Sequence, residues 1–276
     1  MTGLDDVAAE SPPLSVQPRW SGARILGVVL LAVWALCGAG IITFLVAFWN
    51  PELIQRYGPN YASGLWITIK LVLVSVAFGA ILSVPIALGR NAKNRLARSL
   101  SYGYVYFFRG TPLLAQTFLI YYGLGSFRPQ MEAVGLWWFF RDAWYCALFA
   151  FTLNTSAYQA EILRGAVASV PRGQWEAAFA LGLSRLQAIR KIIVPQAALV
   201  ALRPYVNEIV LLLKGSAIVA IITVFDLMGE TRRAYARTFD FQTYIWAALI
   251  YLALVELLRI TTEMIERRLT RHLNRA

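Results

Sequence analysis

A run of 25 consecutive residues without a charged side chain, residues 25–49, constrains this chain more than any other feature. A helix needs about 20 apolar residues to cross a hydrocarbon layer about 30 Å thick, because only its internal hydrogen bonds satisfy the backbone there. The composition agrees, since 58% of the 276 residues are hydrophobic and 15% are charged, against about 25% charged in soluble domains. The sequence therefore predicts an integral membrane protein.

Five further stretches carry few enough charges to cross a membrane. Their charged residues are isolated, and each raises the question of its partner because a charge in hydrocarbon is costly. We therefore expect an all-α membrane protein of about six transmembrane helices. The predicted spans, with the charges inside them, are 25–49, 61–89 (Lys70), 99–127 (Arg109), 143–160, 204–225 (Glu208 and Lys214) and 241–258 (Glu256).

The charges outside the spans divide between the two sides of the membrane. Six crossings place both termini on one side, where the loops carry net charges of +4 (90–98) and +5 (164–203). The stretch from residue 259 adds +3 and the first 24 residues −1, whereas each loop on the other side sums to zero. Since basic loops stay in the cytoplasm, both termini are predicted to be cytoplasmic. The same pattern argues against a nucleic-acid surface, which the net charge of +11 would otherwise suggest.

Few side chains could perform catalysis. No Gly-Lys pair occurs, so the chain lacks a phosphate-binding loop, and His272 is the single histidine. Cys37 and Cys146 fall within apolar spans, where they behave as small hydrophobic residues. We therefore predict no catalytic residue, no metal site and no cofactor in this chain.

The long loop 164–203 has the pattern of a folded element. From Gln174 to Leu181 the apolar residues recur at helical spacing, and Glu176 lies in the first turn, where the helix dipole favours an anion. Gly182 is expected to end this short helix. The aromatic residues Trp175 and Phe179 are expected to hold this helix under the membrane. The small residues Ala177 and Ala180 are expected to face the cytoplasm.

The run Glu176-Ala177-Ala178-Phe179-Ala180-Leu181-Gly182, followed after nine residues by Ile192-Ile193-Val194-Pro195, resembles the Glu-Ala-Ala loop of ABC importer permeases. That pattern usually has leucine where this chain has Val194. Other segments resemble the polar amino acid branch of the family, above all the histidine/lysine/arginine/ornithine and opine permeases. These segments are 108–114, 160–165, 169–174 and 207–209, and the likeness extends over residues 60–270.

The resemblance implies a non-catalytic permease subunit in the bacterial inner membrane, which forms a translocation pathway with a second permease. Two separate ATPase subunits would bind ATP and Mg²⁺, and a periplasmic binding protein would deliver a polar, cationic amino acid. The implied regions are a cytoplasmic tail (1–24), an additional span (25–49), the importer domain (60–270, with five core spans and coupling loop 165–203) and a second cytoplasmic tail (271–276). The cytoplasmic coupling helix would lie in the loop before the fifth of the six transmembrane helices. The residues implied in ATPase coupling are Glu176, Ala177, Ala178 and Gly182.

Polar and charged side chains inside the spans are the candidate pathway residues, since each is costly to bury without a partner. Glu161 and Arg164 lie one helical turn apart and could neutralise each other, whereas Glu208 and Lys214 lie six residues apart and would face different sides. The candidate pathway residues are Arg109, Asn154, Glu161, Glu208, Lys214 and Ser216.

The sequence leaves the site of substrate recognition open. Gly215 and Ala217 stand where many family members carry a polar or acidic residue, which favours recognition by the separate binding protein or the second permease. The binding protein could dock on the outer loop 128–142, with Trp137, Trp138 and Trp144 at or beside it; these could equally form an aromatic belt at the lipid headgroups. Opines, glutamine and other polar amino acids stay open beside the cationic ones.

Two other functions compete with this reading. A secondary transporter or channel acting without an ATPase would have an internal repeat, and the two halves of the sequence resemble each other little. An intramembrane enzyme would need paired catalytic groups, for which Glu161 and Glu208 are the candidates.

Overall fold

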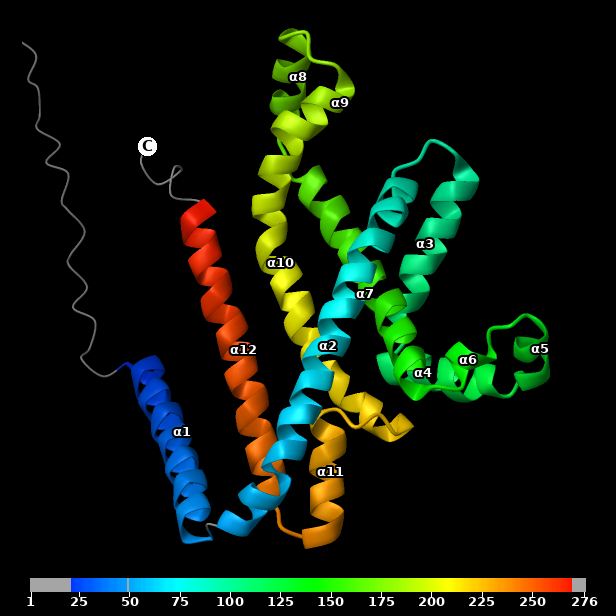
Figure 1. The fold of residues 1–276 in the computed structure, drawn as a ribbon. Coiled ribbons are helices and arrows are strands. Elements are labelled where there is room, and N and C mark those ends of the chain that lie inside the picture. Colours follow the sequence, from blue (N-terminus) through cyan, green and yellow to red (C-terminus); the bar gives the residue numbers. More distant parts are fainter. Residues whose placement is uncertain (1–20, 49, 270–276) are drawn as a thin grey trace, which may run out of the picture. The chain divides into compact units, whose positions relative to one another are not determined.

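The computed structural model describes residues 21–48 and 50–269, and these residues divide into two units between Glu52 and Leu53. Helices make up almost all of this described part, and it contains no β-strand (Figure 1). The predicted tails fall largely outside it. The elements are α1 (Gly22–Ala47), α2 (Pro51–Arg90), α3 (Arg95–Gly110), α4 (Leu113–Phe118), a π-helical turn (Leu119–Gly123), α5 (Arg128–Ala133), α6 (Trp137–Phe140), α7 (Ala143–Ala168), α8 (Arg172–Ala180), α9 (Arg185–Ala188), a second π-helical turn (Ile189–Ile193), α10 (Val194–Gly215), a 3₁₀ helix (Ser216–Ile222), α11 (Leu227–Thr238) and α12 (Gln242–Leu269).

Four helical stretches are long and apolar enough to cross a membrane by length and composition: α1, α2, α12 and the stretch Arg185–Ile222 that contains α10. The predicted span 143–160 lies in α7, which is 26 residues long, but the buried side chains of α7 include several polar ones that lower its mean hydropathy. The all-α membrane fold predicted from the sequence is thus confirmed.

The predicted span 99–127 is not one continuous helix, which corrects the expectation for this segment. α3 ends at Gly110, and α4 begins at Leu113. Between them Thr111 is extended, with φ −111° and ψ 146°, and Pro112 follows it. A proline disfavours helical geometry in the residue before it and has no N–H to continue the helix, so Pro112 interrupts the span near its middle.

Within the unit Leu53–Ala276, the α2–α3 turn, α8, α9 and the last turn of α12 lie at one end (Figure 1). α11 lies at the opposite end, and α5 and α6 lie to one side, next to α4 and the lower end of α7 (Figure 1). The loops with a net positive charge thus lie at one end of this unit and the neutral loop 226–240 at the other.

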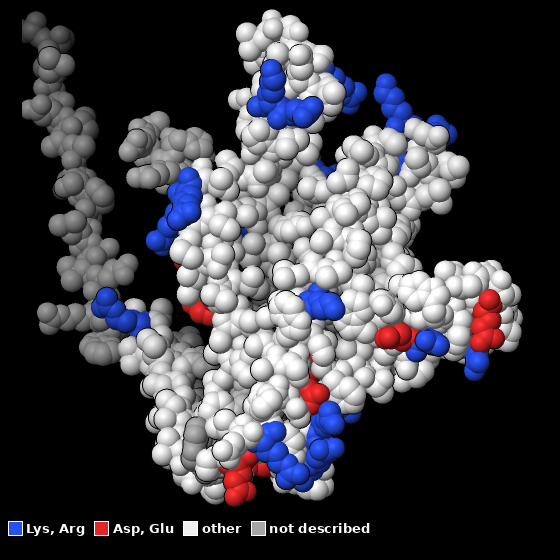
Figure 2. Space-filling view, in the orientation of Figure 1, with Lys and Arg blue, Asp and Glu red and all other residues white. Residues whose placement is uncertain are grey.

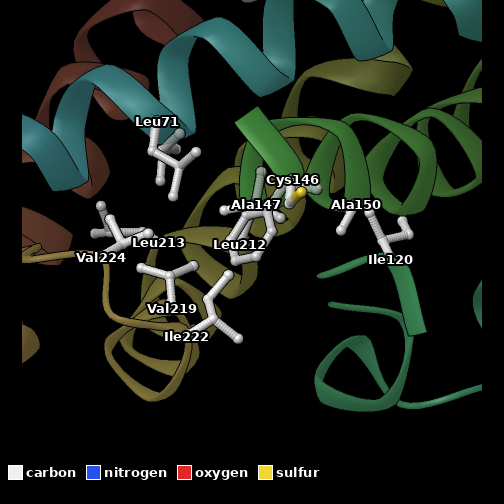
Figure 3. Close-up of a cluster of buried hydrophobic side chains, with 12 residues drawn as sticks. Leu71, Ile120, Cys146, Ala147, Ala150, Leu212, Leu213, Val219, Ile222 and Val224 are labelled. Carbon is white, nitrogen blue, oxygen red and sulfur yellow. The ribbon is translucent and has the colours of Figure 1, made fainter. Parts of the chain in front are cut away.

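The main hydrophobic core joins α2, α7, α10 and the 3₁₀ helix (Figure 3). Leu71 comes from α2, Ala147 from α7, Leu212 from α10 and Val219 from the 3₁₀ helix, and each is buried. Small residues on α7 let the neighbouring helices approach closely, a common arrangement in membrane helix packing. This core fixes the polar side chains of α7 and α10 relative to one another.

A second junction holds α11 against α2 and α12. Asp226 is fully buried and caps α11 by accepting a hydrogen bond from the Gly229 N–H at 2.8 Å. Thr68 of α2 accepts from the Leu227 N–H at 3.0 Å, and Tyr251 of α12 donates to the Asp226 carboxylate at 3.4 Å. These contacts fix α11 through both its backbone and its capping side chain.

Candidate functional site

The short helix α8 has a fully formed C-terminal cap. The Gly182 N–H donates to the Phe179 carbonyl at 2.9 Å, and the Leu183 N–H donates to the Ala178 carbonyl at 3.1 Å. Together these bonds form a Schellman motif, which needs a left-handed residue at the position after the cap. Gly182 fills that position with φ +73°. Gly182 therefore ends the helix as predicted from the sequence. The predicted start is wrong, because α8 begins at Arg172 and Glu176 thus lies beyond its first turn.

One face of α8 packs on the body and the other faces outward. Ala178 is fully buried, and Trp175 packs against a cluster that includes Val170 and Ile193. Glu176, Ala177, Ala180 and Gly182 are exposed. Phe179 was expected to hold the helix under the membrane, but 51% of it is exposed.

The helix α8 is connected rigidly to α10. Ser184 begins α9 with a capping box, in which its side chain and that of Gln187 each bond to the other's backbone. A π-helical turn then leads into α10, whose first turn contains Pro195. The side chain of Gln196 also donates to Gln174 of α8 at 3.2 Å. α8 and α10 are thus joined by a short helical segment and by a side-chain hydrogen bond.

Glu161 makes two ion pairs near the same end of the molecule. Its carboxylate binds Arg164 at 2.8 Å, as the sequence spacing predicted, and Arg90 of α2 at 2.8 Å. Only 13% of the Glu161 side chain is exposed, and 17% of that of Arg90. Arg90 lies 71 positions away, so no local spacing could have indicated this second pair.

A double-mutant cycle on Arg90→Met and Glu161→Gln is expected to give a coupling free energy of about 1–3 kcal/mol, because both side chains are largely buried. Glu161→Gln removes the carboxylate that pairs with Arg90, and Arg90→Met leaves Glu161 with Arg164 alone. The measurement is thermal unfolding of the purified protein in detergent. The exposed pair Arg128–Glu132, also 2.8 Å long, is the matched control and should give about 0.5 kcal/mol or less. Equal coupling in the two pairs would contradict this expectation.

Amide side chains fill the break between α3 and α4. Asn154 of α7 donates to the Phe108 carbonyl at 2.9 Å and to the Gln116 side-chain oxygen at 3.0 Å. Gln116 in turn donates to the Thr111 carbonyl at 3.1 Å. Asn154 therefore holds α7 against a segment whose backbone carbonyls have lost helical partners.

A second polar group, which the sequence analysis missed, lies among α2, α7 and α10. Gln159 donates to the Val76 carbonyl of α2 at 3.2 Å and accepts from the Tyr205 hydroxyl of α10 at 2.8 Å. Gln159 also donates to the Thr155 hydroxyl at 3.1 Å. The signal was present in the sequence, since Thr155 and Gln159 are polar residues one helical turn apart in an apolar span.

The remaining pathway candidates separate in the structure. Glu208 is buried on α10, with 6% of its surface exposed. Arg109 is exposed and lies over the Tyr158 ring at 5.1 Å. Lys214 is exposed, as expected for a side different from that of Glu208, and Ser216 is buried with its hydroxyl on the Leu213 carbonyl. Within residues 21–48 and 50–269, no group of histidine, cysteine and acidic side chains is placed to hold a metal ion.

Comparison with known proteins gives consistent matches. Residues 75–271 match the family described as "Binding-protein-dependent transport system inner membrane component". The chain is 43% identical over 202 residues to the nopaline transport system permease protein NocM of Agrobacterium fabrum, which covers 73% of this chain and 84% of that protein. It is 36% identical over 213 residues to the arginine ABC transporter permease protein ArtM of Escherichia coli, and the match covers 77% of this chain and 96% of that protein.

Solved structures agree with these sequence matches. The crystal structure of an amino acid ABC transporter with histidines superposes with a TM-score of 0.70 and 33% sequence identity. That match covers 79% of this chain and 98% of the other. The resemblance to the polar amino acid branch is therefore confirmed, and the chain belongs to the family of inner membrane components of binding-protein-dependent transport systems.

Proposed function

We propose that this chain is a permease subunit of an ATP-driven importer for cationic amino acids or the opines related to them. Similarity to permeases for nopaline, octopine and arginine supports this class of substrate. Glu208 supplies a buried carboxylate on α10, whereas Glu161 is held in two ion pairs, so Glu208 is the acidic group best placed to attract a cationic solute entering between helices.

The observation that carries the proposal is the exposed, capped helix α8. It presents Glu176, Ala177 and Gly182 at the end of the molecule that carries the basic loops. The small residues Ala177 and Gly182 allow a partner to approach closely. Ala178 supports this surface from beneath, because it is buried under it. Insertion of α8 into a cleft of an ATPase subunit would transmit domain closure through α10 to the pathway.

The assembly would contain this chain, a second permease, two ATPase subunits that bind ATP and Mg²⁺, and a binding protein. The chain itself would be non-catalytic. It would lie in the bacterial inner membrane with both termini in the cytoplasm, in agreement with the distribution of basic loops.

Uptake of labelled arginine into vesicles that contain the complete importer tests this function. Uptake is expected to require both ATP inside the vesicle and the binding protein outside, and nopaline, octopine and lysine are expected to compete better than glutamate. Uptake that persists with this chain alone, without an ATPase or ATP, would replace the proposal with a secondary transporter or channel.

A further inference from the structure

The outer helix α11 has an uneven distribution of charge that its neutral sequence conceals. The loop 226–240 carries three acidic and three basic residues. Asp226 and Glu230 are buried, with 0% and 6% of their surfaces exposed. The Asp240 carboxylate accepts a hydrogen bond from the Gln242 N–H at 2.9 Å, so one of its oxygens is used at the start of α12. The acidic side chains therefore contribute little to the outer surface.

The three arginines of the same helix all face outward. Arg232, Arg233 and Arg237 are exposed, although Arg233 also pairs with Glu230 at 3.5 Å and Arg232 donates to the Ala220 carbonyl at 3.3 Å. Leu227 and Ala234 on the opposite face are fully buried. Blue basic atoms lie at the end of the molecule that carries α11, with red acidic atoms beside them (Figures 1 and 2). Since basic residues are normally concentrated on the cytoplasmic side, the topology rule does not explain a basic helix face at the opposite end.

A hollow and exposed aromatic rings accompany the arginines. The hollow has a volume of about 510 Å³, and its lining includes Arg232, Arg233, Phe225 and Tyr244. Arg233 lies over the Phe225 ring at 5.3 Å. Arginine and aromatic residues are enriched in protein interfaces, and the guanidinium group can bind a carboxylate through two parallel hydrogen bonds.

The other outer loop offers no comparable surface. Arg128 of α5 pairs with Glu132 at 2.8 Å, and Asp142 caps α7 by accepting from the Trp144 N–H at 2.8 Å. Its charges are thus largely paired or used locally, and its exposed residues include the apolar Val134, Leu136 and Trp138. Exposed apolar side chains favour contact with the lipid headgroup region over the docking role for loop 128–142.

We infer that the arginine face of α11, formed by Arg232, Arg233 and Arg237, is the docking surface for an acidic region of the binding protein. This inference rests on the proposed function, because it needs a binding protein that delivers solute to this side. Charge complementarity of this kind mainly accelerates association and weakens as salt screens it.

The test compares the full importer in vesicles with a variant that carries Arg232→Glu, Arg233→Glu and Arg237→Glu. Uptake is measured against the concentration of binding protein. The concentration that gives half-maximal uptake is expected to rise by about tenfold or more at about 0.1 M salt, and the difference should shrink at about 1 M. Maximal uptake at saturating binding protein should be preserved.

A control variant with Arg56→Glu, Arg128→Glu and Arg141→Glu changes the same charge on exposed arginines outside α11, and it should shift half-saturation less than threefold. A milder variant with glutamine at the three α11 positions should shift half-saturation in the same direction as glutamate. It guards against a folding defect from charge reversal.

Equal half-saturation in wild type and both α11 variants would overturn the inference while leaving the proposed function intact. An effect that follows the fraction of phosphatidylglycerol in the vesicles, at saturating binding protein, would assign the arginines to lipid headgroups and also overturn it. Failure of the proposed function itself would look different, because wild-type uptake would then not require a binding protein.

Discussion

Replacing Gly182 with aspartate is expected to lower ATP-driven uptake by about tenfold or more, while the importer still assembles in the membrane. Gly182 has φ +73°, a conformation that costs most L-residues about 1–2 kcal/mol. An anion at the C-terminal end of α8 also opposes the helix dipole by about 0.3–1 kcal/mol. The new carboxylate would further project from the surface that we assign to the ATPase. The measurement is initial uptake of labelled arginine, with co-purification of the ATPase subunits recorded in parallel.

The chain contains a closely matched control for this substitution. Gly135 ends α5 in the same motif, with φ +70° and with the Gly135 and Leu136 N–H groups donating to the Glu132 and Met131 carbonyls. No other atom lies within 4 Å of a Cβ built at Gly135 or at Gly182. Gly135→Asp therefore imposes the same local cost in the outer loop and should keep more than about half of the uptake. Equal losses from both substitutions would show that local strain, rather than coupling, explains the Gly182 effect.

Replacing Gly64 with valine is expected to separate α2 from α11 and destabilise the protein by at least about 1–3 kcal/mol. A Cβ at Gly64 would lie 2.8 Å from the Asp226 carbonyl oxygen and 3.1 Å from the Leu227 Cα. Both are backbone atoms, so no side-chain rotation can relieve the overlap. The helices would have to move apart, and the bonds that Thr68 and Tyr251 make at Asp226 and Leu227 would weaken.

Thermal unfolding in detergent measures this effect, with the yield of monodisperse protein as a second readout. Gly58→Val in the same helix is the control, because nothing lies within 4 Å of a Cβ at that position. Both substitutions place a β-branched residue at a helical glycine, so their helix propensity costs are similar. If the Gly64→Val protein unfolds at the same temperature as the Gly58→Val protein, the close packing of α2 on α11 is contradicted.

The features that the sequence predicted are those with a local signal. Uncharged runs located the membrane helices, and glycine at position 182 located the end of α8, since few other residues adopt its conformation. The break at Pro112 also had a local signal in Gly110-Thr111-Pro112, but the apolar residues on both sides made one span the simpler expectation.

Features that depend on packing had no such signal. The pairing of Glu161 with Arg90 requires α2 and α7 to lie side by side, and the polar group around Gln159 requires α10 as well. The basic face of α11 was hidden for a different reason. A sum of charges gives the buried Asp226 and the exposed Arg237 equal weight, although only the charge of Arg237 acts on an approaching partner.

The break between α3 and α4 bears on how this permease prevents leaks. Interrupted backbone within hydrocarbon normally requires water or another polar partner, and a row of waters would offer protons a route across the membrane. Here the side-chain amides of Asn154 and Gln116 donate hydrogen bonds to the carbonyls of Phe108 and Thr111. Because these donors belong to the protein, the Phe108 and Thr111 carbonyls need no solvent partner at the break, and no row of waters is required there to satisfy them.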